Sequence, residues 1–190
     1  MRFTSKNAPI LVIIGPSGAG KSTIIRKLYD KGLILINPTW TTRPPRPQET
    51  DEGIEHKFVS NSEFSKRQAS DYFLEVVELF GLPYRYGVPE ILPTSSEQVS
   101  LLMLRAPLIP LLNKHYPVHI IYQIEDELPK VRERLIARQQ NGEDMGTRLE
   151  DYEKEIVAGR KLAKRVFVNN KKPEQVAKQV EKAIVEDFAK

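Results

Sequence analysis

The sequence predicts an α/β fold, in which helices cover both faces of a parallel sheet. Short apolar runs rich in β-branched residues alternate with amphipathic helical segments, a pattern typical of parallel sheets. Hydrophobic residues make up 40% of the chain and charged residues 28%, as in ordinary globular proteins. A length of 190 residues fits one domain, 1–190, with a substantial core.

Composition excludes several classes of protein. The chain has no cysteine, which excludes disulfides and thiolate metal sites. Its net charge of +4 comes from basic residues scattered among acids, without a basic arm, so we expect no nucleic-acid partner. Residues 1–9 lack the apolar stretch of a signal peptide, and no run has membrane-spanning length. We therefore expect a cytoplasmic protein with no membrane partner.

The first elements are a strand, a turn and a helix. Residues 10–14 (ILVII) are apolar and mostly β-branched, which indicates a buried strand. Residues 21–30 follow as a helix with one apolar side, and Gly32 stands where the C-cap of that helix is expected. Residues 33–36 predict a second strand.

The next region, 37–93, differs in character. It holds half of the 14 prolines and mixes short segments with turns. Residues 54–59 predict a strand, residues 62–70 a helix and residues 72–80 an extended segment. The predicted division is a core of residues 1–36 and 94–190 and an inserted lobe of residues 37–93.

The remaining segments return to the alternating pattern. We expect strands at 99–104, 118–124 and 166–168, and helices at 128–140, at 148–164 and from Pro173 onward. Residues 141–146 (NGEDMG) are polar and contain two glycines, which indicates a flexible loop. With its flanks, residues 134–148, this loop is predicted to be a mobile lid.

A phosphate-binding loop follows the first strand. Residues 15–22 (GPSGAGKS) match the pattern GxxxxGK[ST] between a strand and a helix. Glycines let the backbone fold around phosphate, and the helix adds its positive N-terminal end. Lys21 is expected to contact the β- and γ-phosphates, and Ser22 to ligate magnesium. The residues predicted to hold ATP and Mg²⁺ are Gly15, Pro16, Ser17, Gly18, Ala19, Gly20, Lys21, Ser22 and Thr23.

A second candidate phosphate site is residues 41–46 (TTRPPR). Arg43 and Arg46 stand three apart on a proline-stiffened segment, so both could clamp one phosphate with little entropy to lose. Residues 43–47 also fit a polyproline II ligand for an SH3-type domain. The intact phosphate loop upstream favours the phosphate site.

These motifs, taken together, resemble the guanylate kinase family. In chain order they are GPSGAGKST at 15–23, TTRPPR at 41–46, Glu49 and Gly53, FVS at 58–60, FLE at 73–75, YG at 86–87 and VN at 168–169. Their order and spacing cover nearly the whole chain, which makes them far more specific than the phosphate loop alone.

The resemblance implies a P-loop NTPase core with a small mononucleotide-binding lobe. It implies transfer of the γ-phosphoryl of ATP to GMP or dGMP, giving ADP and GDP. Arg43, Arg46 and Tyr86 would hold the acceptor phosphate, and His56 stands where the family has a tyrosine that helps there. Glu75 would accept hydrogen bonds from N1 and the exocyclic amine of guanine.

The resemblance also assigns roles to the lid. Arg134, Arg138 and Arg148 look like the family's lid arginines, and Asn169 looks like the residue beside the adenine. Lys21, Arg43, Arg138 and Arg148 would neutralise charge during transfer, and lid closure would exclude water.

The chain departs from the family in its acceptor site. Trp40 and Val88 replace a serine before TTR and a hydroxyl residue that donates to guanine O6. Residues 101–107 (LLMLRAP) contain none of the acids that this strand usually carries. Arg105, within that stretch, could add positive charge near the phosphates or pair with Glu90 or another acid. A divergent guanylate kinase and a kinase for another acceptor both remain open.

Two other function classes fit parts of the sequence. Guanylate kinase-like domains also act as protein-binding modules, which typically lose the lysine that Lys21 supplies here. Other P-loop kinases, such as those acting on phosphorylated sugars, share the fold. Adenylate kinase is disfavoured by the GPSGAGKST loop, and thymidylate kinase by the absence of an Asp-Arg-Tyr-like motif.

Overall fold

The computed structural model describes residues 9–45, 49, 54–78, 83–95, 97–116, 119–137 and 142–188, with residues 142–148 described by their backbone alone. In this part of the chain the main sheet has five parallel strands. Their order across the sheet is β2 (Ile34–Asn37), β7 (Val99–Met103), β1 (Ile10–Ile14), β8 (His119–Glu125) and β9 (Arg165–Val168).

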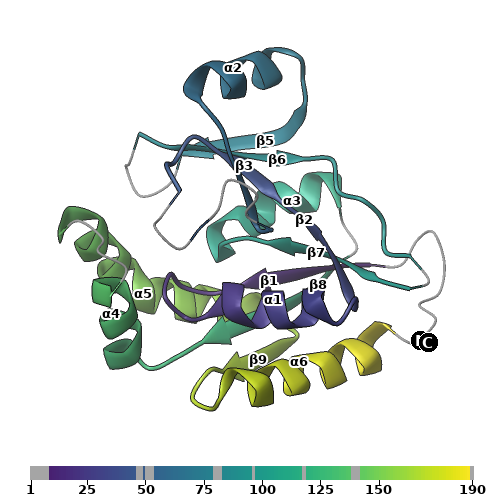
Figure 1. Ribbon diagram of the computed structural model, residues 1–190, viewed down its shortest axis with the longest axis vertical. Coiled ribbons are helices and arrows are strands. Elements are labelled where there is room, and N and C mark those ends of the chain that lie inside the picture. The colour runs from purple at the N-terminus through teal and green to yellow at the C-terminus, as the bar shows by residue number, and fades with distance from the viewer. Residues whose placement is uncertain are drawn as a thin grey trace.

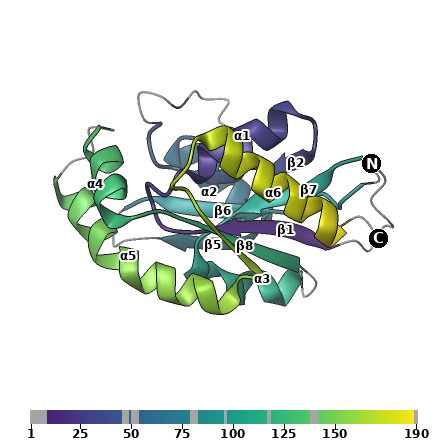
Figure 2. The same ribbon diagram turned by 90° about the horizontal axis from the view of Figure 1, so that it is seen from below.

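Helices cover both faces of the main sheet. Figure 2 shows α1 (Lys21–Asp30) and α6 (Pro173–Phe188) on one face, and α3 (Ile109–His115) and α5 (Gly142–Leu162) on the other. A 3₁₀ turn, η1 (Ala106–Leu108), precedes α3, and α4 (Leu128–Ala137) precedes α5. No helix among the described residues is long and apolar enough to cross a bilayer.

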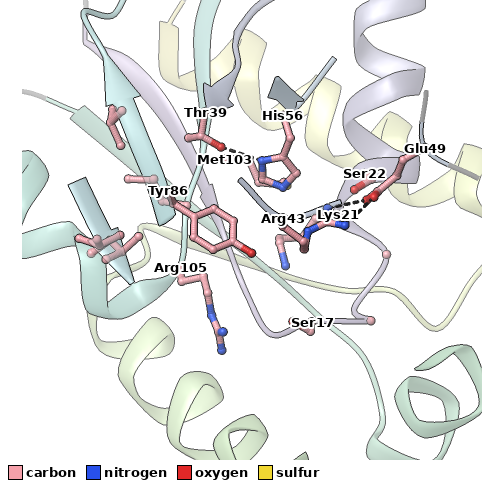
Figure 3. Close-up of a pocket in the computed structure, with 16 residues that line it drawn as sticks. Ser17, Lys21, Ser22, Thr39, Arg43, Glu49, His56, Tyr86, Met103 and Arg105 are labelled. Carbon is pink, nitrogen blue, oxygen red and sulfur yellow. Dashed lines mark hydrogen bonds and ion pairs between the residues drawn. The ribbon is translucent and has the colours of Figure 1, made fainter. Parts of the chain in front are cut away.

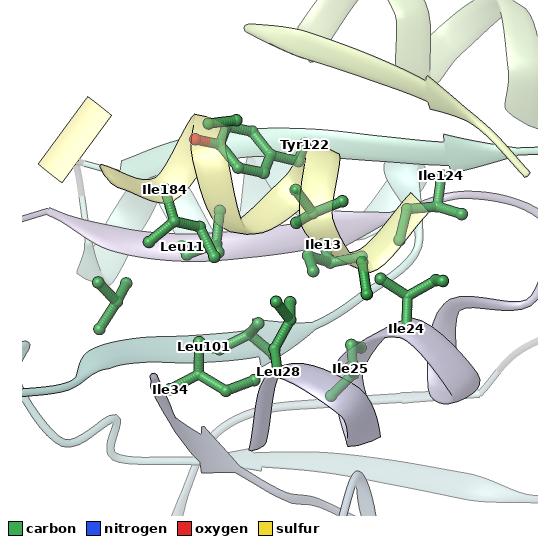
Figure 4. Packing of buried hydrophobic residues seen from close by; sticks show 14 of the residues in the cluster. Leu11, Ile13, Ile24, Ile25, Leu28, Ile34, Leu101, Tyr122, Ile124 and Ile184 are labelled. Atoms are coloured by element: carbon green, nitrogen blue, oxygen red, sulfur yellow. The ribbon is translucent and has the colours of Figure 1, made fainter. Parts of the chain in front are cut away.

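Strand β1 is apolar throughout because both of its faces are buried. Leu11 and Ile13 belong to the hydrophobic cluster under α1 and α6, which Figure 4 shows. Ile10, Val12 and Ile14 belong to the cluster on the opposite face. A strand in the middle of a parallel sheet therefore holds the phosphate loop at its carboxyl end on a rigid base.

A second, smaller sheet forms the lobe at the top of Figure 1. Among the described residues its strand order is β4 (His56–Phe58), β3 (Thr39–Thr41), β6 (Arg85–Pro89) and β5 (Phe73–Glu78), and α2 (Asn61–Ala69) lies beside it. Its strands pair in mixed directions, parallel for β3 with β4 and antiparallel for the rest.

Trp40 belongs to the interior of this lobe. Its side chain is 4% exposed, and its ring packs edge-on against Tyr72 and Phe73, with centroids 5.1 and 5.7 Å away. Neighbouring side chains of a strand point to opposite faces, so Thr39 faces the pocket described below while Trp40 faces away from it. Trp40, which stands where the resembling sequences have a serine, therefore changes the packing of the lobe.

The predicted fold class is confirmed, since a parallel sheet flanked by helices is what the structure shows. The prediction of a loop at 141–146 is wrong, because α5 already begins at Gly142. Two glycines suggested a loop, but Glu143 and Asp144 lie in the first turn of α5, where acidic residues are favourable.

Candidate active site

One pocket lies between the phosphate loop and the lobe (Figure 3). The floor is formed by Ser17, Gly18 and Gly20 of the loop between β1 and α1 and by the first two residues of α1, Lys21 and Ser22. The lobe contributes side chains from β3, β4 and β6, and the end of β7 closes the opposite wall. The phosphate loop and Arg43, from the second candidate phosphate site, therefore face the same space.

The phosphate loop is held in shape by its own lysine. The Lys21 ammonium donates hydrogen bonds to the carbonyl oxygens of Gly15 and Pro16, at 2.7 and 2.8 Å. Gly20, at the N-cap of α1, has φ of +90°, a conformation that glycine adopts without strain.

Two residues brace the outer side of the loop. Arg134 of α4 donates to the Gly18 carbonyl at 3.0 Å and to the Asp126 carboxylate at 2.6 Å. Asn169 donates from its side chain to the Ala19 carbonyl at 3.0 Å. The structure thus brings these two sequence-predicted residues to the phosphate loop.

Arg43 is buried and fixed on the lobe side of the pocket. Its guanidinium makes two hydrogen bonds to Glu49, at 2.8 and 3.1 Å, and lies over the Phe58 ring. A third bond reaches the Pro44 carbonyl. The pairing with Glu49 fixes the orientation of the guanidinium and offsets part of its charge, so an anion would bind the remaining N–H groups.

His56 and Tyr86 complete the lobe wall. The His56 ring shares a hydrogen bond with the Thr39 hydroxyl at 2.7 Å, and its centroid lies 6.3 Å from that of Tyr86. Both side chains line the pocket together with Arg43 (Figure 3).

An apolar chamber adjoins this pocket behind Val77 and Val88. Val77, Val88, Leu104 and Leu108 line both spaces. The rest of its lining, Leu74, Glu75, Leu111, Leu112 and His115, lies in β5 and α3. Glu75 therefore stands in the inner chamber and not beside the phosphate loop.

Lys114 and His115 of α3 face Glu75. Lys114 Nζ and His115 Nε2 lie 3.4 and 3.3 Å from its Oε1. Sequence reasoning missed both residues, because it predicted no helix at 106–115. Pro107 and Pro110 obscured the pattern, although each stands in the first turn of a helix, where proline is tolerated.

Comparison with known proteins agrees with this geometry. A sequence model of the family described as guanylate kinase matches residues 7–187. The chain belongs to the guanylate kinase family. It is 34% identical to a guanylate kinase of Symbiobacterium thermophilum over 134 residues, which are 68% of this chain and 62% of that protein.

Other relatives match over shorter stretches. A guanylate kinase of Thermobifida fusca is 43% identical over 81 residues, or 42% of this chain. The match spans only 40% of that relative's own length. The crystal structure of guanylate kinase from Anaplasma phagocytophilum has a TM-score of 0.68 at 23% identity, over 97% of this chain and 89% of that chain. At this identity the likeness shows the fold.

Arg105 occupies the stretch in which guanylate kinases usually carry acids. It lines the pocket and makes an ion pair with Glu155 of α5, a side chain that is 4% exposed. Its acidic partner is thus Glu155 and not Glu90. This ion pair links the pocket wall to α5.

Some predicted guanylate kinase residues lie outside the described part of the chain. These are Arg46, Gly53 and Arg138, together with the side chain of Arg148. Their roles stay predictions.

Glu55 is a buried acidic residue that sequence reasoning missed. It stands just before β4, its side chain is buried, and its Oε1 atom has no hydrogen-bond partner. Burial raises the pKa of Glu55, which a hydrogen bond with the Ser22 side chain and the charge of Arg26 partly offset. No local sequence signal joins Glu55 to Ser22.

The residues around Ser22 fit the magnesium that the family implies. A P-loop hydroxyl and one nearby carboxylate are the protein groups that Mg²⁺ uses when nucleotide phosphates supply most other oxygens. Among the described residues no group of three acidic or histidine side chains could hold a metal without nucleotide.

Proposed function

We propose that this protein is an ATP-dependent nucleoside monophosphate kinase, which transfers the γ-phosphoryl of ATP to GMP or dGMP. One observation carries the proposal. The phosphate loop with Lys21 and the lobe wall with Arg43, His56 and Tyr86 face one pocket. A donor site opposite an acceptor site is what direct phosphoryl transfer requires.

The pocket residues divide between the two substrates. The loop amides and Lys21 bind the β- and γ-phosphates of ATP, while Lys21 exchanges the Gly15 and Pro16 carbonyls for phosphate oxygens. Arg43, Tyr86 and His56 hold the acceptor phosphate. Magnesium, bound with ATP at Ser22, supplies positive charge to the phosphates.

Transfer needs no general base, because an oxygen of the acceptor phosphate is itself the nucleophile. That oxygen forms a bond to the γ-phosphorus as the bond to the β,γ-bridging oxygen breaks, and ADP leaves. Arg138 and Arg148, brought in by the lid, add charge neutralisation. Arg134 and Asn169 hold the phosphate loop and the adenine side of the site.

A second candidate is the same reaction with another acceptor. It is favoured by the inner chamber, whose walls are mainly Val and Leu and whose Glu75 already faces Lys114 and His115. A carboxylate that already pairs with Lys114 and lies within hydrogen-bond distance of His115 has less capacity to accept hydrogen bonds from guanine.

The test is ADP formation with ATP-Mg and a panel of acceptors: GMP, dGMP, IMP, AMP, CMP, UMP, TMP and a phosphorylated ribose. Lys21→Ala is the blank. Highest activity with GMP and dGMP supports the first candidate, and highest activity with another acceptor supports the second. Binding of ATP without activity on any acceptor would refute both and favour a protein-binding module.

A further inference from the structure

The backbone of Arg105 is fixed beside the phosphate loop. The amide of Leu104, the residue before it, donates to the Ile13 carbonyl at 3.1 Å, and Ile13 stands two residues before Gly15 of that loop. The Arg105 carbonyl accepts from the Leu108 amide at 3.0 Å, which closes η1. In open parallel sheets, ligands bind outside the carboxyl ends of the strands. Arg105 therefore stands at the edge of the main sheet where a ligand is expected.

The side chain of Arg105 belongs both to the pocket and to the interior of the protein. It lines the pocket together with Lys21, Arg43 and Tyr86 (Figure 3), and it is 15% exposed. The side chain of its ion-pair partner, Glu155 of α5, is 4% exposed. A buried carboxylate thus keeps the guanidinium at the pocket wall and restricts its motion.

A guanidinium can bind two anions at the same time. It carries five N–H groups in a planar fork, and one carboxylate engages at most two of them. An arginine can therefore pair with a carboxylate through one edge and with a phosphate through another. The carboxylate offsets part of the charge, but it also orients the contact in advance.

We propose that Arg105 binds the phosphate of the acceptor from the wall formed by the main sheet, opposite Arg43 and Tyr86 of the lobe. The acceptor phosphate is then held by arginines from both sheets. Residues 99–107 contain no aspartate or glutamate, whereas guanylate kinases usually carry acids in this stretch. The exchange of acids for an arginine reverses the charge of this wall, and an anion is the ligand that the new charge favours.

This inference rests on the proposed function, and its test uses the acceptor that gives the most ADP in the panel. Steady-state kinetics yield the KM for that acceptor and the KM for ATP separately. Arg105→Gln removes the guanidinium, and Arg105→Lys keeps the charge without the planar fork. Arg160→Gln is the matched control, because Arg160 pairs with the buried Glu125 carboxylate and lines a separate hollow.

We expect Arg105→Gln to raise the KM for the acceptor by about 10- to 100-fold, the usual effect of losing a charge-assisted hydrogen bond. The KM for ATP should stay that of the wild type. Arg105→Lys should recover part of the loss, since its ammonium still attracts the phosphate. Arg160→Gln should leave both KM values unchanged.

A second variant separates binding from folding. Arg105→Gln leaves the Glu155 carboxylate buried without its cation, which by itself destabilises a protein. The double variant Arg105→Met, Glu155→Met removes both charges and keeps apolar volume, a replacement that buried ion pairs often tolerate. It should unfold at about the temperature of the wild type and still show the raised KM for the acceptor.

Two results would overturn this inference alone. A double variant with the wild-type KM for the acceptor would make the ion pair only a structural contact between η1 and α5. An equal rise of both KM values in Arg105→Gln would mean a general disturbance of the pocket. A wild-type protein that forms ADP with no acceptor would instead refute the proposed function, and the role of Arg105 with it.

Discussion

At the scale of single residues, Gly20 shows how closely the phosphate loop is packed. A Cβ atom at this position would lie 2.2 Å from the side-chain nitrogen of Asn169. That nitrogen donates to the Ala19 carbonyl, so the two contacts compete for the same space. Gly32 also has positive φ, +68°, but no atom lies within 4 Å of its would-be Cβ.

The two glycines form a matched pair of variants. Gly20→Ala and Gly32→Ala should each cost about 1–2 kcal/mol of unfolding free energy for the left-handed backbone. Gly20→Ala should in addition displace Asn169 and abolish ADP binding, whereas Gly32→Ala should bind ADP like the wild type. Urea unfolding and ADP titration measure both effects, and unchanged ADP affinity in Gly20→Ala would contradict the packing argument.

Substitution of Glu75 tests whether guanine binds in the inner chamber. Loss of a hydrogen-bonding carboxylate in Glu75→Ala should lower kcat/KM for GMP by about 10- to 100-fold, with the KM for ATP unchanged. Glu78→Ala, at the exposed end of the same strand, is the control. If Glu75→Ala and Glu78→Ala use GMP equally well, Glu75 does not contact the base.

At the scale of secondary-structure elements, Asp187 joins α6 to two strands. Its carboxylate accepts two hydrogen bonds from Arg165 of β9, both at 2.8 Å, and one from the Tyr122 hydroxyl of β8 at 2.7 Å. Lys164 lies 3.0 Å away. The Arg165 guanidinium holds the pKa of Asp187 well below its usual range, although burial acts in the opposite direction.

Asp187→Asn should therefore destabilise the protein in a pH-dependent way. The folded-state pKa is depressed, so the stabilisation is present above the unfolded value of about 3.9 and is lost as pH falls below it. We expect the variant to lose about 3 kcal/mol of unfolding free energy at pH 7. The side chain of Asp187 is nearly buried, and its cationic partners remain charged without it.

The measurement is urea unfolding of the wild type and Asp187→Asn between pH 3 and pH 7. The difference in unfolding free energy between the two proteins should be constant above about pH 5 and should become smaller below pH 4. Glu186→Gln is the control, because Glu186 pairs with the same Arg165 from an exposed position and should cost about 0–1 kcal/mol. A difference that widens toward low pH would contradict the assignment.

At the scale of the whole molecule, the pocket draws its walls from two sheets. Ligands that contact both walls stabilise the folded state by mass action. ADP-Mg at 100 times its Kd should raise the unfolding free energy by about 2.7 kcal/mol, and GMP should add a comparable increment. Thermal unfolding with each ligand measures this, and Lys21→Ala should lose most of the ADP effect. Stabilisation by ADP with none from GMP would indicate another acceptor.

The sequence predicted the main sheet and the phosphate loop because both have local signals. Strand β1 is a continuous apolar run, β7 and β8 are mostly apolar, and the loop has a defined pattern between a strand and a helix. Strand β3, by contrast, has three residues, and β6 contains Gly87 and Pro89. Neither strand has the length, or the alternation of apolar and polar residues, by which a strand is recognised in a sequence.

Parts of the candidate site could not be predicted because they depend on distant contacts. Glu75 contacts Lys114 and His115, which lie 39 and 40 residues further along the sequence. Glu55, whose pKa responds to the Ser22 side chain, stands 33 residues from Ser22 in the sequence. Arg43 lines the pocket, and its bidentate pairing with Glu49 is seen only in the folded lobe.

The position of β1 in the middle of the main sheet has a consequence for synthesis. Leu11 pairs with Leu101 on one side and with Ile120 on the other, and Asn169 closes the phosphate loop. During synthesis β1 leaves the ribosome long before these partners are made. The apolar segment is therefore without its neighbouring strands during that time. Such a nascent chain is a substrate for chaperones, and the loop that is made first is the part of the site finished last.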